Sequence, residues 1–247
     1  MSQWLFDLGN SRFKFASLRE DGHVGDVQAW AHGTDMLREG SEDALPRGEV
    51  AWVASVAAPA LTAQVVEWLQ RRFARVEIAH TLGECAGVRV GYAEPRRFGV
   101  DRFLALLGAR RQGAVLVAGV GTALTIDLLD ASGQHHGGRI AASPTTMREA
   151  LHQRAAQLPA AGGDYAEFAN DTADALASGC DGAAVALIER SLQQAVVRLG
   201  PVRLLLHGGG APALLHLLPG AEHRPSLVLD GLATWAAHHP TGDRPPP

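Results

Sequence analysis

Cysteine is scarce in this sequence, with two residues, Cys85 and Cys180, in a chain of 247. They lie far apart and match no metal-ligand spacing, so a disulfide framework is not expected and a reducing compartment is the simplest interpretation. Charged residues make up only 19% of the chain, whereas 47% of its residues are hydrophobic. This balance is typical of a globular protein that buries a core, and the length allows one large domain or two modest ones.

Long apolar runs and a large excess of charge of one sign are also missing. No uninterrupted apolar stretch is long enough to span a membrane. The first residues, MSQWLFDLGN, contain no basic segment followed by an apolar one, so no secretory leader is expected. The net charge is −4 and no basic stripe stands out, which argues against nucleic acid as the main partner. We therefore expect a cytoplasmic protein that binds neither membrane nor nucleic acid.

Several common catalytic motifs are absent. The sequence has no Walker A motif, no protein-kinase glycine loop, no GxSxG nucleophile elbow and no HExxH zinc motif. If this protein handles ATP, it must do so with another architecture.

The hydrophobic patterns predict an α/β protein built from two similar halves. Each half begins with a strand, a glycine-containing turn with Ser or Thr, and a returning strand, which indicates a duplicated unit. We place the domains at residues 1–113 and 114–247, the latter ending in a disordered tail, HHPTGDRPPP. The expected strands are a hairpin over 4–17 and segments 50–56, 76–79, 114–118, 123–129, 202–207 and 227–229. The expected helices cover 60–73, 102–111, 146–158 and 182–199, with others starting at 212 and ending at 237.

The first hairpin carries a candidate phosphate loop. Gly9, Asn10 and Ser11 form a turn whose backbone N–H groups can approach an anion closely. Asp7, two residues before the turn, is suited to holding Mg²⁺ directly or through water, and Lys14 is placed to reach a phosphate. Taken alone, these residues are explained slightly better by a plain hairpin with a strand-end carboxylate.

The second half offers a similar loop. Gly121 and Thr122 form the turn, and Thr125 and Asp127 follow on an apolar strand. A carboxylate in such a strand is costly to bury unless it is paired or bound to a metal. A tight glycine turn with a partly exposed Asp127 is the structural alternative. Because two such loops occur in one chain, we favour a pair that grips one polyphosphate from two sides.

A third motif joins Gly99, Val100, Asp101 and Arg102, with Tyr92 shortly before it. Asp is a favoured N-cap, and we expect Asp101 to cap the helix that follows. A helix N-terminus also keeps a carboxylate ionised, so the capping role and a functional role are compatible.

The glycine loop at 207–210 is the fourth motif. It either admits an adenine ring against the backbone or makes a tight turn between strand and helix. The pairs at 135–136 and 238–239 are histidines without metal partners at useful spacing, and we expect them in a surface loop and in the tail.

Taken in order, DLGNSRFK, GVDR and GTALTID resemble the type III pantothenate kinases of the acetate and sugar kinase, Hsp70 and actin superfamily. Further matches are Tyr92, the Gly137-Gly138-x-Ile140 stretch, and Thr172 with Ala175 and Gly179. The resemblance runs from Asp7 to about Gly231. It implies two RNase H-like domains of the actin-like ATPase type with ATP in the cleft between them, and a homodimer with pantothenate near the dimer interface.

The resemblance also assigns residues. It implies Asp101 as the catalytic base, Asp7 as the Mg²⁺-associated acid, and Asp127 at the site of a monovalent cation, K⁺ or NH₄⁺. The implied ATP and phosphate contacts are Asp7, Gly9, Asn10, Ser11, Lys14, Gly121, Thr122 and Thr125. The implied pantothenate contacts are Tyr92, Gly99, Val100, Arg102 and Thr172.

The sequence departs from the family pattern at two positions. Ala142-Ser143 stands where a Pro-Gly pair is usual, with Pro144 one residue late, and Asn170-Asp171-Thr172 carries one residue more than the usual Asn-Thr. Neither change removes a group assigned to catalysis.

The resulting hypothesis is ATP-dependent phosphorylation of pantothenate in coenzyme A biosynthesis. Two alternatives remain: a phosphatase of the same superfamily acting on polyphosphate or a nucleotide, and a non-catalytic nucleotide-binding regulator or actin-like assembly protein.

Overall fold

The computed structural model describes residues 2–32 and 40–239, and these form two compact units. The first unit contains the described residues up to Arg111, the segment Ser132–His135 and the described residues from Ser226 to His239. The second contains Gln112–Ala131 and His136–Pro225. The chain thus returns to the first unit at its end, whereas the sequence prediction placed all of 114–247 in the second domain.

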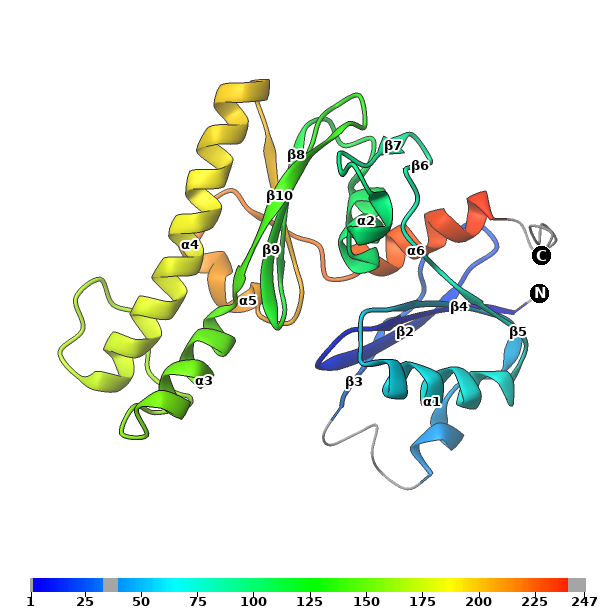
Figure 1. The fold of residues 1–247 in the computed structure, drawn as a ribbon, viewed down its shortest axis with the longest axis horizontal. Helices are drawn as coiled ribbons and strands as arrows, with labels where there is room; N and C mark the ends of the chain where they lie inside the picture. Colours follow the sequence, from blue (N-terminus) through cyan, green and yellow to red (C-terminus); the bar gives the residue numbers. More distant parts are fainter. Residues whose placement is uncertain (1, 33–39, 240–247) are drawn as a thin grey trace. The chain divides into compact units, whose positions relative to one another are not determined.

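A mixed sheet of five strands forms the centre of the first unit, in the order β3-β2-β1-β4-β5 (Figure 1). β1 and β2 form the expected antiparallel hairpin, and β4 and β5 run parallel to β1 and β4 respectively. The strands are β1 (Gln3–Leu8), β2 (Arg12–Leu18), β3 (Gln28–Ala31), β4 (Gly48–Ser55) and β5 (Phe73–Ile78).

Alternation along the strands gives this sheet two different faces. Phe6 and Leu8 of β1 point to one face and pack in a core with Val65 and Leu69 of α1 (Pro59–Gln70). Asp7 lies between them and so points to the opposite face. Two helices, α2 (Val100–Ala109) and α6 (Leu227–His238), contact the same sheet.

Two glycines let α2 and α6 pack closely. A Cβ at Gly231 would lie 1.8 Å from the Leu104 carbonyl oxygen, and one at Gly108 would lie 2.2 Å from the Leu227 carbonyl oxygen. Both distances are far below van der Waals contact, so each helix presents bare backbone to the other. The unit also contains a small hairpin, β6 (Glu84–Cys85) and β7 (Val88–Arg89), and 3-10 turns at Ser41–Ala44 and Pro95–Arg97.

The second unit repeats the sheet of the first, with the strand order β10-β9-β8-β11-β12. The strands are β8 (Val115–Val120), β9 (Ala123–Leu129), β10 (His135–Ala142), β11 (Arg203–His207) and β12 (Glu222–His223). Its helices are α3 (Pro144–Arg154), α4 (Thr172–Leu199) and α5 (Ala211–Leu214), and a 3-10 turn at Leu215–Leu217 follows. The identical order in both sheets confirms the predicted duplicated α/β unit.

Three predictions about elements were wrong. The segment 227–229, expected as a strand, is the first turn of α6. α4 begins at Thr172, ten residues before the expected start. The N-cap of α2 is Gly99, and Asp101 lies in the first turn instead of capping it. Most of the tail expected to be disordered lies outside the described residues, although His238 ends α6. None of the described helices has both the length and the apolar character needed to cross a membrane.

Candidate active site

The turn between β1 and β2 is compact and exposes its tip. The backbone N–H of Gly9 donates to the Arg12 carbonyl oxygen at 3.0 Å, and a Cβ at Gly9 would lie 3.3 Å from that same oxygen. Asn10 and Ser11 are exposed at the tip. Asp7 pairs across the hairpin with Lys14, which places a carboxylate and an ammonium group on the same face just below the turn.

Asp7 and Asp101 form a pair of interacting carboxyl groups within the first unit. Burial raises the pKa of Asp7 to about 6, an effect opposed by the Lys14 ammonium group and reinforced by the Asp101 carboxylate. Asp101 lies in the first turn of α2. The helix N-terminus favours a negative charge on its carboxyl group. Two oxygen-donor carboxylates near a phosphate loop suit Mg²⁺, which is usually held by one or two carboxylates together with substrate phosphates.

The turn between β8 and β9 is the counterpart in the second unit. Its Gly121 N–H donates to the Ala123 carbonyl oxygen at 2.9 Å, and Gly121 and Thr122 are exposed. Thr125 pairs with Gly119 across the hairpin, and a Cβ at Gly119 would lie 2.8 Å from its hydroxyl oxygen. Asp127 lies deeper on the same strand and is buried, with 3% of its surface exposed.

The glycine loop after β11 packs against the base of this turn. Gly208 has a positive φ of 93°, and a Cβ there would lie 2.4 Å from the Val120 carbonyl oxygen. Gly210 N–H donates to that oxygen at 3.0 Å. The fourth sequence motif is therefore adjacent to the second candidate phosphate loop, and only glycine fits at position 208.

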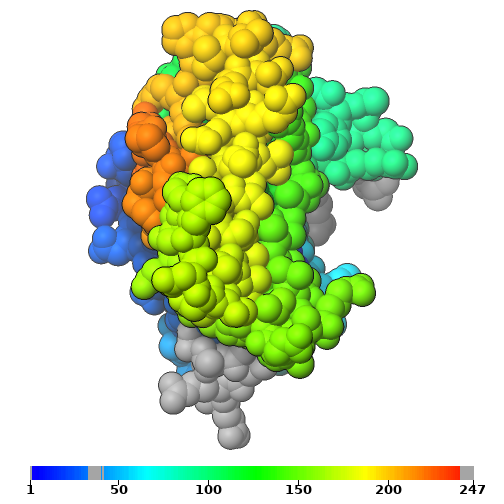
Figure 2. Space-filling model, turned by 90° about the vertical axis from the view of Figure 1, so that its left-hand side faces the viewer, coloured from blue at the N-terminus to red at the C-terminus, as the bar shows by residue number. Residues whose placement is uncertain are grey.

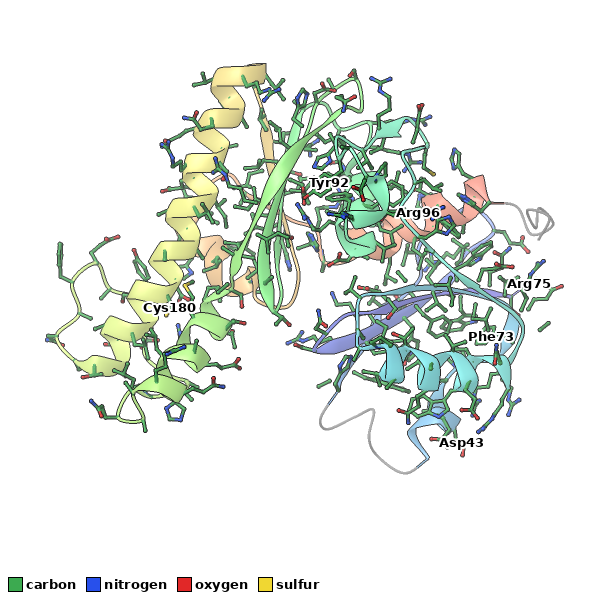
Figure 3. All side chains as sticks on the ribbon, in the orientation of Figure 1. Asp43, Phe73, Arg75, Tyr92, Arg96 and Cys180 are labelled. Carbon is green, nitrogen blue, oxygen red and sulfur yellow. The ribbon has the colours of Figure 1, made fainter. Side chains whose placement is uncertain are left out.

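The guanidinium group of Arg102 packs against a cluster of aromatic rings. Its carbon lies 4.7 Å from the centre of the Phe98 ring and 6.0 Å from that of Tyr92, and its Nη1 donates to the Tyr92 hydroxyl at 3.3 Å. Tyr92 lies beside α2 (Figure 3). Arg102 is buried at 6% exposure, so contact with the rings fixes its position. Tyr92 and Arg102, predicted from sequence, are thus brought together, with Gly99 and Val100 at the start of the same helix.

His135 completes this cluster and was not identified from the sequence. It is 1% exposed, and its ring lies 4.7 Å from that of Phe98 and 5.9 Å from that of Tyr92. Its Nδ1 accepts a hydrogen bond from Gly91 N–H at 3.4 Å. The expectation of a surface position was wrong because the histidine pair was judged by its local sequence, whereas the rings that bury His135 lie more than 35 residues away.

Thr172, the remaining predicted substrate contact, is the first residue of α4. Asp171 caps that helix, and its Oδ1 accepts from the N–H groups of Ala173 at 2.9 Å and Asp174 at 3.1 Å. The segment 170–172, which is one residue longer than the family pattern, therefore includes an ordinary helix N-cap, Asp171. Ser143, at the other departure from the family pattern, caps α3 in the same manner.

No group of three or more His, Cys, Asp or Glu side chains within the described residues is arranged to hold a metal ion. A divalent ion at Asp7 would therefore need ligands from a bound phosphate or from water, which is the coordination that Mg²⁺ prefers.

Solved structures of other proteins share the fold of this chain. A putative Baf family transcriptional activator from Campylobacter jejuni superposes with a TM-score of 0.59 at 18% identity, covering 93% of this chain and 94% of that one. A putative 2-dehydro-3-deoxygalactonokinase from Sinorhizobium meliloti gives 0.53 at 16% identity, covering 94% and 97%. These likenesses show the fold, and the predicted two-domain actin-like fold is confirmed.

Curated relatives are much closer in sequence. Type III pantothenate kinase from Stenotrophomonas maltophilia (strain R551-3) is 70% identical over 98% of this chain and 100% of its own length. The protein of the same name from Xanthomonas campestris pv. campestris (strain B100) is 71% identical, over 96% and 98%. A family model described as type III pantothenate kinase matches residues 4–194. The chain therefore belongs to the type III pantothenate kinase family.

Proposed function

We propose that this protein transfers the terminal phosphoryl group of ATP to the primary hydroxyl of pantothenate, giving 4′-phosphopantothenate for coenzyme A biosynthesis. The observation that carries the proposal is the pairing of Asp7 with Asp101 within the first unit. Asp7 lies two residues before the turn at Gly9, and Asp101 is followed by the buried Arg102. The carboxylate beside the candidate phosphate turn and the carboxylate beside the candidate acceptor groups thus interact within one unit.

Each residue has a separate task in this reaction. Gly9, Asn10 and Ser11 would bind phosphate oxygens through the first turn, and Gly121, Thr122 and Thr125 would do so through the second. Asp101 would accept the hydroxyl proton as the new O–P bond forms and the bond to ADP breaks. Phosphoryl transfer depends mainly on positioning and charge stabilisation, so a base near the attacking oxygen is sufficient.

Arg102 and Tyr92 would bind the acceptor. A guanidinium group held against aromatic rings presents its N–H donors in a fixed plane, which matches a carboxylate through paired hydrogen bonds. Pantothenate has one carboxylate at the end opposite its primary hydroxyl. Arg102 directly follows Asp101 in the first turn of α2, so binding that carboxylate at the end of the long Arg102 side chain would leave the primary hydroxyl to reach the Asp101 carboxylate.

Two cations belong to the proposal. Asp7 would hold Mg²⁺, which would neutralise charge on the ATP phosphates. Asp127 would hold K⁺ or NH₄⁺, because it is a buried carboxylate on the strand that leaves the second phosphate turn. Replacing Na⁺ with K⁺ or NH₄⁺ at constant ionic strength should raise the rate strongly in the wild-type protein, and Asp127→Asn should abolish that difference. Equal wild-type rates in the three salts would contradict the cation assignment.

We also propose a homodimer. Several apolar side chains of the second unit are exposed to an unusual degree, namely Ile140 on β10, Phe168 before α4 and Val197 on α4, at 65%, 99% and 82%. Phe168 lies before the first turn of α4 and Val197 lies in its last turn, so they do not form one apolar patch, and each is a separate candidate for burial against a second copy of the chain. Figure 2 shows the face of the second unit on which α4 and the connection from α3 are in the foreground.

The deciding experiment is an assay of the purified protein with Mg²⁺-ATP, K⁺ and pantothenate, with phosphopantothenate detected by mass spectrometry. The product should form only when all components are present. Nucleotide binding without turnover would favour the non-catalytic regulator, and phosphate release from polyphosphate or nucleotide without pantothenate would favour the phosphatase.

A further inference from the structure

Thr146, a residue without an assigned role, contacts the second candidate phosphate turn from α3. Its hydroxyl donates to the carbonyl oxygen of Thr122 at 2.6 Å. Thr146 is the third residue of α3, and both residues belong to the second unit. The helix that begins at Pro144 is therefore tied to the tip of that turn by a short hydrogen bond.

Ser143 prepares Thr146 for this contact. Its Oγ accepts from the Thr146 N–H at 3.3 Å, and its hydroxyl donates to the Thr146 hydroxyl oxygen at the same distance. Ser143 is 1% exposed, so its position is fixed by packing. With its oxygen accepting from Ser143, the Thr146 hydroxyl is left to donate its own proton to Thr122, and hydrogen bonds arranged in such a chain polarise and strengthen one another.

The contact fixes the direction of a backbone N–H group. Thr122 C=O and Ala123 N–H belong to the same planar trans peptide, so they point in opposite directions. Because Thr146 holds the carbonyl oxygen, the Ala123 N–H points away from α3. The turn itself is exposed, and its Gly121 N–H donates to the Ala123 carbonyl oxygen, so loss of the Thr146 bond would remove a restraint on this peptide plane.

We propose that Thr146 is a positioning residue for nucleotide binding: it holds the Thr122–Ala123 peptide in the orientation that presents its N–H to a phosphate oxygen of ATP. This inference rests on the proposed function, since it assumes that the β8–β9 turn binds phosphate. The inference also assigns a role to Ser143, which lies where the sequence departs from the family pattern. Ser143 both caps α3 and orients the Thr146 hydroxyl.

The test compares Thr146→Val with two controls. Thr146→Val keeps the shape of the side chain and removes the hydroxyl, whereas Thr146→Ser keeps the hydroxyl. Thr145→Val makes the same change at the exposed neighbouring residue. The dissociation constant of a non-hydrolysable ATP analogue with Mg²⁺ is measured by calorimetry, without pantothenate, and the two KM values are measured by assay.

We expect Thr146→Val to weaken analogue binding and raise the KM for ATP by about 3- to 10-fold, the effect of losing one neutral hydrogen bond. The KM for pantothenate should change by less than about twofold, and both controls should match the wild type. Equal analogue binding by Thr146→Val and Thr145→Val would overturn the inference. If Thr146→Val fails to fold, Thr146→Ala gives the same comparison. Absence of analogue binding by the wild type would instead contradict the proposed function.

Discussion

At the scale of single residues, Asp7 interrupts the apolar pattern of a buried strand. Its neighbours Phe6 and Leu8 are fully buried, and its own charge is disfavoured by burial and by Asp101. A group whose folded-state pKa lies above its ordinary value favours folding when protonated, and this contribution is lost as the pH rises through that pKa. Asp7 therefore destabilises the nucleotide-free protein at neutral pH, as expected of a residue kept for function.

Asp7→Asn should consequently stabilise the nucleotide-free protein while abolishing activity. Between pH 4 and pH 6 the advantage of the variant should grow, and above pH 7 it should stay constant at about 1–2 kcal/mol, allowing for partial exposure of the side chain. The measurement is the Tm of both proteins from pH 4 to pH 8 without nucleotide. The exposed Asp26→Asn provides the control and should show no such trend. A Tm difference between the two proteins that does not depend on pH would mean that burial does not raise the pKa of Asp7.

Asp101→Asn separates the catalytic role of Asp101 from its structural role. Because Gly99 is the N-cap of α2, the variant leaves the capping residue of the helix unchanged. Loss of the favourable helix-terminus interaction, about 0.3–1 kcal/mol, is offset by relief of the repulsion from Asp7. Stability should therefore change by less than about 1 kcal/mol, whereas kcat should fall about 10²–10⁴-fold with the KM for ATP retained. Near-normal turnover in this variant would leave Asp101 without a catalytic role.

At the scale of elements, the sequence prediction succeeded where neighbouring residues determine the structure and failed where distant residues determine it. The β1–β2 hairpin follows from alternation and a Gly-Asn turn, both contained in about fifteen residues, and it was predicted correctly. The segment 227–229 was wrongly predicted as a strand, because α6 is buried on nearly all sides and shows no helical stripe of polar residues. The Arg102 cluster was only half predicted, because His135 joins it from a different part of the chain.

The packing of α2 on α6 gives a prediction at this scale. Gly231→Ala should destabilise the protein by about 1–3 kcal/mol, because its Cβ would overlap the Leu104 carbonyl oxygen and the helices would have to separate. Since α2 carries Asp101 and Arg102, the variant should also lower kcat/KM. Stability is measured by urea unfolding.

Gly179→Ala is the matched control for this change. Gly179 lies in the interior of α4, and a Cβ there would meet nothing within 4 Å. Alanine should therefore stabilise the protein by about 0.5–1 kcal/mol through its higher helix propensity. If both variants lost stability equally, the loss would come from glycine replacement in general and not from the α2–α6 contact.

At the scale of the whole molecule, the duplicated sheet explains why each unit has one candidate phosphate turn. In both sheets the first two strands form a hairpin at the centre, and the turn between them is the candidate loop. The carboxylates differ, however. Asp7 precedes its turn and interacts with Lys14 and Asp101, whereas Asp127 follows its turn deep in the second unit. Duplication of the backbone with divergence of the side chains thus accounts for the different cations that we propose for the two turns.

The proposed homodimer gives the last prediction. Phe168 and Val197 expose 99% and 82% of their surface, and replacing both with Asp should place two charges in any interface that covers them. The double variant should sediment as a monomer at concentrations where the wild type is a dimer. Its kcat/KM for pantothenate should fall at least tenfold if both subunits complete the acceptor site, and analogue binding should persist.

The control for this prediction is Ile78→Asp, an equally polar change at an apolar residue of the first unit that is 50% exposed. This variant should remain dimeric and active, which would show that the position of the charge matters and not its presence. An active monomer of the double variant would contradict the idea that pantothenate contacts come from both subunits. A double variant that stays dimeric would place the interface elsewhere on the molecule, because two buried carboxylates without partners cost more than a typical subunit contact contributes.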